Sequence, residues 1–113
     1  MSEPGDEIDG REVLLDFSIF PVDQGESLSR HVSRAIDIVV RSGLPYRVGP
    51  MGTTLEGTYA DCMKVVSDCF ADMSRECKRV VVQVKVDYRS GREGALDSKI
   101  ASVERRLGRK LRT

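Results

Sequence analysis

The segment from Arg79 to Arg89 (RVVVQVKVDYR) constrains the fold most, because an apolar side chain recurs at every second position. This period of two predicts a β-strand with one apolar face, made by Val80, Val82, Val84, Val86 and Tyr88, and one mixed face. Residues 13–20 (VLLDFSIF) alternate in the same way and predict another strand. Pro21 ends the ladder of this strand, because proline lacks the N–H that pairing requires.

A long helix is predicted after the first strand, over residues 27–42. Its apolar side chains recur with helical spacing and form one stripe: Leu28, Val32, Ala35, Ile36, Val39 and Val40. Ser27 is a suitable N-cap, and Glu26 lies near the positive end of the helix dipole. Gly43 suits the left-handed conformation that commonly ends a helix.

The remaining elements follow from the same periodicities. Residues 46–49 and 53–56 predict two short strands joined by a turn, and residues 58–76 predict a second helix capped by Thr58 or Asp61. The apolar stripe of that helix comprises Cys62, Val66, Cys69, Phe70, Met73 and Cys77. Residues 97–111 predict a last helix with the apolar face Ile100, Val103, Leu107 and Leu111.

The order βαββαβ plus a C-terminal helix predicts an α+β, ferredoxin-like split βαβ fold. In this fold, helices cover one face of a four-stranded antiparallel sheet with the spatial order 4-1-3-2. The last strand then lies at an edge, where a long valine-rich strand is exposed to pairing with other chains. We therefore predict a homo-oligomer in which another copy covers such surfaces.

Length and composition bound the remaining possibilities. The 113 residues suffice for one domain, which we place at residues 12–113, after an acidic tail (1–11) that we expect to be disordered. Lys plus Arg and Asp plus Glu both number 18, so the chain lacks the basic excess of a nucleic-acid binder. The sequence contains neither a membrane-spanning apolar run nor a signal peptide, so we expect no membrane partner and a cytoplasmic location.

Cysteine and histidine offer few candidates for chemistry. The three cysteines lie on the apolar stripe of the second helix, where we interpret them as small buried side chains. Cys77, which precedes Lys78 and Arg79, is the one candidate for a reactive thiol. His31 is expected at the solvent or at the edge of the core. The pattern predicts no metal site, no catalytic triad and no phosphate-binding loop.

The sheet face without helices brings polar residues together. In the predicted strand order, Asp16, Ser18 and Phe20 lie near Lys85, Asp87 and Arg89, with Thr54 and Glu56 alongside. This face is either a solvated surface, a salt-bridge network between subunits, or a small-ligand site. Leu14, Phe20 and Val81 share the face and favour at least partial covering.

The segment Pro50-Met51-Gly52-Thr53-Thr54-Leu55-Glu56-Gly57 resembles the PMGT-x-x-EG signature of the thiamine-binding, YkoF-like family, also known as MTH1187-type or UPF0045 proteins. Further segments are similar to the family in the same order: FSIFP (17–21), SGLPY (42–46), RVV (79–81) with VKVDYR (84–89), and KIASVE (99–104). The resemblance covers roughly residues 13–107. It implies a ferredoxin-like fold and homo-oligomers, commonly tetramers built as dimers of dimers.

The resemblance also implies a binding function without catalysis and without a cofactor. The ligand is thiamine or its hydroxymethylpyrimidine moiety, and the residues that match are Ser18, Phe20, Tyr46, Gly52, Thr53, Glu56, Lys85 and Asp87. Gly52 permits close backbone approach, Thr53 and Ser18 offer hydrogen bonds, and Glu56 offers an acceptor for the amino group. Phe20 or Tyr46 would stack on the ring, whereas Lys85 and Asp87, with Arg89, serve either the ligand or a subunit interface. Alternatively, the PMGT segment has a mainly structural role, because Pro, Gly and Thr suit a turn.

Three functions remain open from the sequence. The first is a carrier or sensor of thiamine or its pyrimidine precursor, for which Glu56 and Thr53 should share a cavity. The second is a structural or regulatory oligomer without a small ligand, whose open face is filled by another subunit. The third is an enzyme with Glu56 or Asp87 as general base, which no motif in the sequence requires.

Overall fold

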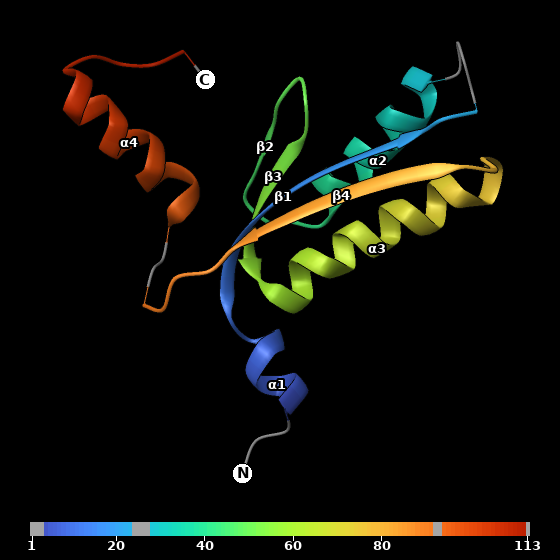
Figure 1. Cartoon of the computed structure of the whole chain (residues 1–113), viewed down its shortest axis with the longest axis horizontal. Helices are drawn as coiled ribbons and strands as arrows, with labels where there is room; N and C mark the ends of the chain where they lie inside the picture. Colours follow the sequence, from blue (N-terminus) through green and yellow to red (C-terminus); the bar gives the residue numbers. More distant parts are fainter. Residues whose placement is uncertain (1–3, 24–27, 92–93, 113) are drawn as a thin grey trace.

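The computed structural model describes residues 4–23, 28–91 and 94–112, and its four strands form one antiparallel sheet. The order across the sheet is β2-β3-β1-β4, which is the predicted order and confirms the ferredoxin-like α+β fold (Figure 1). Strand β1 is central and pairs with β3 on one side and β4 on the other. The strands comprise β1 (Glu12–Pro21), β2 (Tyr46–Val48), β3 (Thr53–Thr58) and β4 (Val80–Asp87).

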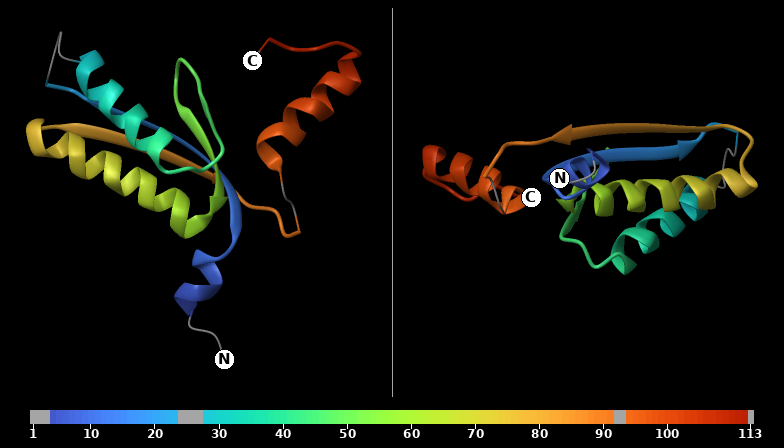
Figure 2. Two further views of the ribbon diagram at one scale, coloured as in Figure 1. Left: turned by 180° about the vertical axis from the view of Figure 1, so that it is seen from behind. Right: turned by 90° about the horizontal axis from the view of Figure 1, so that it is seen from below.

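Helices α2 (Leu28–Arg41) and α3 (Tyr59–Glu76) form a single layer under one face of this sheet (Figure 2). The core lies between the two layers, because strand side chains that face the helices alternate with side chains that face away. Its strand residues include Val13, Leu15, Phe17 and Leu55, and its helix residues include Ala35, Val39, Val66, Cys69 and Met73. Within the described residues, no helix is both long and apolar enough to cross a bilayer.

The ends of the long helices follow the sequence signals. Gly43 has a φ of 76° after α2, as the predicted left-handed residue requires. The side chain of Thr58 caps α3, because its Oγ1 accepts a hydrogen bond of 3.1 Å from the N–H of Asp61. The predicted capping residues of α2, Ser27 and Glu26, lie outside the described residues.

Part of the N-terminal segment that we expected to be disordered lies within the described residues. Pro4–Asp9 form a short helix, α1, which lies near α3. Pro4 occupies the first helical position, where its missing N–H leaves no hydrogen bond unmade and its fixed φ suits a helix. The helix is followed by β1, and the N–H of Arg11 donates to the carbonyl of Ile8 at 3.2 Å.

The orientation of His31 differs from the prediction. The side chain is only 1% exposed, and its Nε2 lies 3.6 Å from the Sγ of Cys77, so the expected solvent or boundary position is wrong. The cause is the phase of α2: residues 31, 35 and 39 face α3, and the predicted stripe included the neighbouring face as well.

All three cysteines are buried, as predicted. Burial raises the pKa of the Cys62 and Cys69 thiols to about 11. Burial also raises the pKa of Cys77, so the candidate reactive thiol is held in its protonated form at neutral pH.

Helix α4 (Ala95–Leu107) departs from the expected range of residues 97–111. It ends early because Gly108 adopts a φ of 71° and its N–H donates to the carbonyl of Glu104. Leu111 therefore lies beyond the helix. Val103 and Leu107, on the predicted apolar face, are 47% and 53% exposed rather than packed on the sheet.

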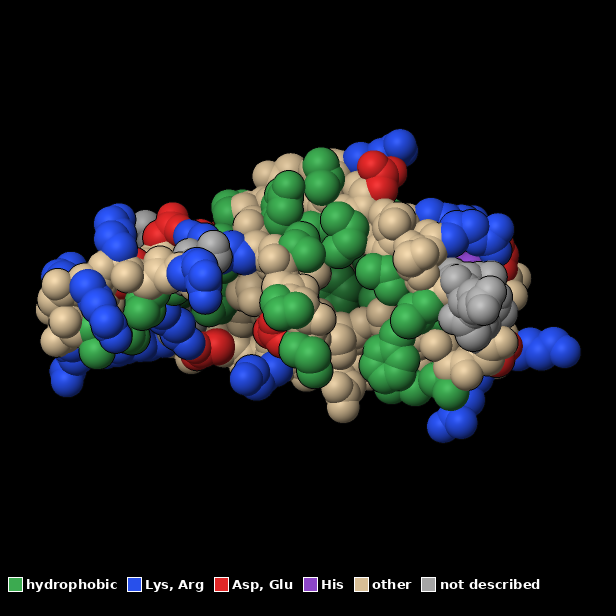
Figure 3. Space-filling view, turned by 90° about the horizontal axis from the view of Figure 1, so that it is seen from above, with side chains coloured by type: hydrophobic (Ala, Val, Ile, Leu, Met, Phe, Trp, Pro, Cys, Tyr) green, Lys and Arg blue, Asp and Glu red, His purple; other side chains and the backbone are tan. Residues whose placement is uncertain are grey.

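The start of α4 is attached to the sheet by three polar contacts from three different strands. The N–H of Leu96 donates to Oε2 of Glu56 in β3 at 2.9 Å. Arg47 in β2 pairs with Asp97 at 2.5 Å, and Lys99 pairs with Asp87 in β4. Beyond this attachment the helix projects from the domain, and its surface carries many Lys and Arg side chains (Figure 3, left).

We expect Glu56→Ala to loosen the start of α4 without unfolding the sheet. The N–H of Leu96 loses its charged acceptor, and hydrogen bonds to charged groups contribute about 1.5–3 kcal/mol. Amide hydrogen exchange over residues 95–99 should become roughly ten-fold faster, while exchange in β1 stays unchanged. Glu12→Ala, which removes an exposed carboxylate of β1, is the control, and equal exchange in the two variants would contradict the assignment.

A charge network joins α2 to the last turns of α3. Arg34 donates to Asp72 at 2.6 Å and to Glu76 at 2.9 Å, and Arg30 pairs with Glu76 at 3.2 Å. The hydrogen bond and charge of Arg34 lower the pKa of the exposed Glu76 carboxyl below its ordinary value of 4.5. The contribution of Glu76 to stability is therefore complete above its ordinary pKa and is lost as the pH falls through the lowered pKa.

We expect Glu76→Gln to lower the melting temperature at neutral pH, because the neutral amide forms a weaker contact with Arg34. The difference from the wild-type protein should shrink between about pH 5 and pH 3, as Glu76 becomes protonated in the wild-type protein. Thermal melts across this range measure the difference. A difference that stays constant with pH would show that the charge of Glu76 does not contribute.

Candidate functional site

The signature segment forms the tight turn between β2 and β3. The N–H of Gly49 donates to the carbonyl of Gly52 at 2.8 Å, so Pro50 and Met51 make a two-residue loop. A Cβ on Gly52 would lie 3.1 Å from the carbonyl oxygen of Phe17 and 3.4 Å from the Asp16 carboxylate. Glycine therefore allows this turn to pack directly against β1.

A pocket of about 260 Å³ lies between this turn, the last part of β1 and α2. Its walls are mostly apolar and include Leu28, Val32, Ala35 and Ile36 of α2 with Val48 and Met51 of the hairpin. Figure 3 shows a hollow between apolar side chains in this region of the surface. The volume is close to the lower end of the roughly 300–1,000 Å³ typical of small-molecule sites.

Four of the eight predicted site residues line this pocket: Ser18, Phe20, Gly52 and Thr53. Thr53 faces the helix layer and is only 6% exposed. Ser18 and Phe20 belong to the other side-chain face of β1 and line the pocket at its edge. Among the described lining residues, none has an ionisable side chain.

Glu56, Lys85 and Asp87 lie on the opposite face of the sheet. The strand period of two separates them from the pocket, because Thr53 and Leu55 face the helices whereas Glu56 faces away. The side chains of Glu56 and Thr53 therefore face opposite sides of the sheet, and the Glu56 carboxylate contacts the N-terminus of α4. Tyr46 lies on the outer strand β2, 41% exposed and outside the pocket.

The open face carries a polar hollow of its own, which is lined by Asp16, Thr54, Lys85, Asp87 and Lys99, among others. Thr54 donates a 3.0 Å hydrogen bond to Asp16, and the strand register places Asp16 opposite Lys85. The predicted proximity of Asp16 to Lys85 is confirmed. Asp87, however, lies opposite Leu14 and forms an ion pair with Lys99.

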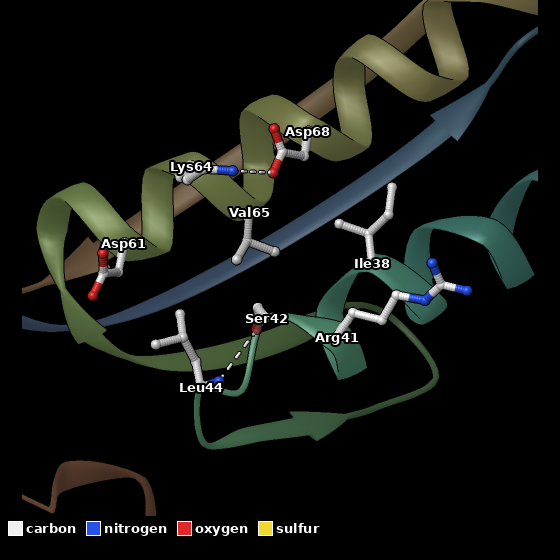
Figure 4. Close-up of a pocket in the computed structure, with 8 residues that line it drawn as sticks. All are labelled: Ile38, Arg41, Ser42, Leu44, Asp61, Lys64, Val65 and Asp68. Carbon is white, nitrogen blue, oxygen red and sulfur yellow. Dashed lines mark hydrogen bonds and ion pairs between the residues drawn. The ribbon is translucent and has the colours of Figure 1, made fainter.

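A third hollow, of about 520 Å³, lies between α2 and α3 (Figure 4). Its charged rim includes Lys64 and Asp68, which pair with each other at 2.8 Å across one turn of α3. Its apolar floor includes Ile38, Leu44 and Val65. None of the eight predicted site residues lines this groove, so we centre the candidate site on the pocket under the β2–β3 turn.

The contribution of α2 to this pocket was not predicted from the sequence. Val32 and Ile36 were assigned to the core stripe, yet both are half-buried and line the pocket. The available signal was the width of the stripe, because six apolar positions cover more of the helix surface than one packing face needs. The excess positions form a second apolar face beside the sheet.

Comparison with known proteins identifies the family of this chain. Residues 15–104 match the family described as thiamine-binding protein. A UPF0045 protein of Mycobacterium tuberculosis is 40% identical over 96 residues, which span 84% of this chain and 94% of that protein. The family match at residues 15–104 therefore includes most of the sheet, both packed helices and most of α4.

Two solved structures share the fold and more than a quarter of the aligned residues. The protein MJ1052 of Methanocaldococcus jannaschii has a TM-score of 0.76 and 29% identity, covering 82% of this chain and 96% of that chain. TM0486 of Thermotoga maritima, named for a role in thiamine biosynthesis or salvage, has a TM-score of 0.73 and 27% identity. The match covers 81% of this chain and 98% of that chain. With its family match over most of its length, the chain belongs to the thiamine-binding protein family.

Proposed function

We propose that this protein binds thiamine or its hydroxymethylpyrimidine moiety in the pocket under the β2–β3 turn. The observation that carries the proposal is that the signature residues Gly52 and Thr53 line a small apolar pocket together with Ser18 and Phe20. An apolar pocket with few polar groups suits a planar ring that needs only a few directed hydrogen bonds. Family membership makes thiamine the ligand to test first.

The pocket offers complementary chemistry for an aminopyrimidine. Thr53 has a hydroxyl that both donates and accepts, and Val32 and Ile36 supply apolar surface for the faces of the ring. Phe20, which is 40% exposed at the edge, offers an aromatic face to the cationic thiazolium ring of thiamine. We assign Glu56 and Asp87 to the attachment of α4 instead of the ligand.

The proposed role is binding without catalysis, as a cytoplasmic carrier or sensor. Acid–base catalysis needs a titratable group within reach of the reacting atoms, and the described lining residues include none. The buried pair His31 and Cys77 lies between α2 and the end of α3, and neither residue lines the pocket. The pocket is therefore suited to holding a ligand unchanged.

We propose further that the protein is a homo-oligomer, assembled through β4 and built as a dimer of dimers. Val84 and Val86 face the helix layer but remain 40% exposed each, because the helices do not cover this edge of the sheet. Phe70 of α3 is 48% exposed as well. This apolar edge also favours the second candidate function, an oligomeric interaction protein without a small ligand.

A larger side chain that fills the pocket should weaken ligand binding. We expect Val32→Phe to weaken thiamine and hydroxymethylpyrimidine binding by at least ten-fold, or about 1.4 kcal/mol, in isothermal titration. The control is Val40→Phe, the same substitution on the same helix at a residue that is 49% exposed and outside the pocket. Absence of heat with the wild-type protein would favour the interaction protein.

Introducing charge at the edge should dissociate the oligomer. We expect Val84→Lys, combined with Val86→Lys, to lower the mass measured by light scattering, because the lysines would have to be buried between copies. Ser33→Lys, on the exposed side of α2, is the control and should leave the mass unchanged. An unchanged mass in the double variant would place the interface elsewhere.

A further inference from the structure

Strand β1 continues beyond the end of its partner β3. The register pairs β1 with β3 only as far as Phe17 opposite Thr53, whereas β1 pairs with β4 as far as Pro21 opposite Val80. On the side facing β3, the backbone of β1 is therefore free of a strand partner after Phe17. The pocket lies at this free edge, and Ile19 lines it.

Two hydrogen bonds outside the ladder show which main-chain groups point to that edge. The N–H of Val22 donates to Arg79 at 2.9 Å, which places the main-chain groups of even-numbered β1 residues toward β4. The carbonyl of Arg11 accepts from Tyr59 at 2.8 Å, so odd-numbered residues point toward β3. Ile19 is odd-numbered, and both its N–H and its C=O point toward the missing part of β3.

These two groups of Ile19 have no partner within the described part of the chain. Extending the register would place Met51 opposite Ile19, but Met51 lies in the two-residue loop and is 88% exposed. The loop turns away from β1 at Gly52, which packs on the carbonyl of Phe17. Phe17 is the odd-numbered residue before Ile19, and its main-chain groups also point toward β3. Ile19 thus places one main-chain donor and one main-chain acceptor side by side, in the plane of the sheet, at the edge where the pocket lies.

We propose that Ile19 binds the ligand through these two main-chain groups. The ligand then takes the position of the residue that a longer β3 would supply. The recognised class is a planar heteroaromatic ring with an exocyclic N–H donor beside a ring-nitrogen acceptor. Such a ring pairs with one residue of a strand edge by two hydrogen bonds, as a neighbouring strand does. The inference rests on the proposed pyrimidine-binding function and defines the part of the ligand that is recognised.

The first test uses the free protein and no ligand. In hydrogen exchange followed by NMR, the amide of Ile19 should exchange at least ten-fold faster than those of Ser18 and Phe20, which pair with Gln83 and Val81 of β4. Equally slow exchange at Ile19 would mean that its N–H already has a partner, such as a second copy of the chain. That result would overturn the inference.

The second test removes the donor. Replacing the Ser18–Ile19 amide by an ester deletes the Ile19 N–H, which does not point toward β4, and every N–H of the β4 ladder stays in place. The ester also weakens the Ser18 carbonyl as an acceptor for Gln83, so the melting temperature of the ester protein is measured beside its ligand binding. We expect 4-amino-5-hydroxymethyl-2-methylpyrimidine to bind at least ten-fold more weakly, and its analogue without the amino group to bind weakly to both proteins. Val40→Phe, at a residue of α2 that is 49% exposed and outside the pocket, is the control and should bind within about three-fold of the wild-type protein.

The outcomes separate the inference from the proposed function. If the wild-type protein binds neither pyrimidine nor thiamine, the proposed function fails, whatever the exchange rate of Ile19. If the wild-type protein binds and Val32→Phe weakens binding, but the ester does not, the function stands and the role of Ile19 is overturned. A ligand-induced shift of the Ile19 amide resonance, with slowed exchange, supports both.

Discussion

The antiparallel pairing of β1 on both sides is the interaction on which the rest of this structure depends. This strand carries buried side chains on its helix-facing side, including Leu15 and Phe17, so its register fixes which residues of β3 and β4 face the core. A shift of one residue would exchange the two faces of the strand. The same register decides where β3 ends along β1, and this end is where the pocket begins.

The period of two along β3 divides the signature segment between two tasks. Thr53 and Leu55 face inward, to the pocket and the core, whereas Thr54 and Glu56 face outward, to Asp16 and α4. Gly52 allows the turn to lie against β1. A short run of residues thus forms part of a pocket wall, contacts the start of α4 and closes a hairpin.

Most of the fold could be predicted because local periodicity reports which side of an element is buried. The four strands, the two packed helices and the strand order followed from alternation and stripes. The burial of His31 could not be predicted in this way, because it depends on the rotation of α2 against α3. The exposed face of α4 escaped prediction for a similar reason, since an apolar stripe indicates a partner without showing that it lies in the same chain. Only part of the predicted site came together, because one sequence motif supplies residues to both faces of a sheet.

The mismatch in length between β1 and β3 gives a physical reason for a pocket at this position. The N–H and C=O of the half-buried Ile19 destabilise the free protein by less than the roughly 1–3 kcal/mol of a fully buried unmade hydrogen bond, because water reaches them in part. A longer β3 would pair with Ile19 and remove this cost, but the extended strand would occupy the space next to β1. The short strand keeps both the space and the unpaired groups at one place. A ligand that satisfies those groups gains the hydrogen bonds while the protein needs little rearrangement, and this is the energetic basis of a preorganised site.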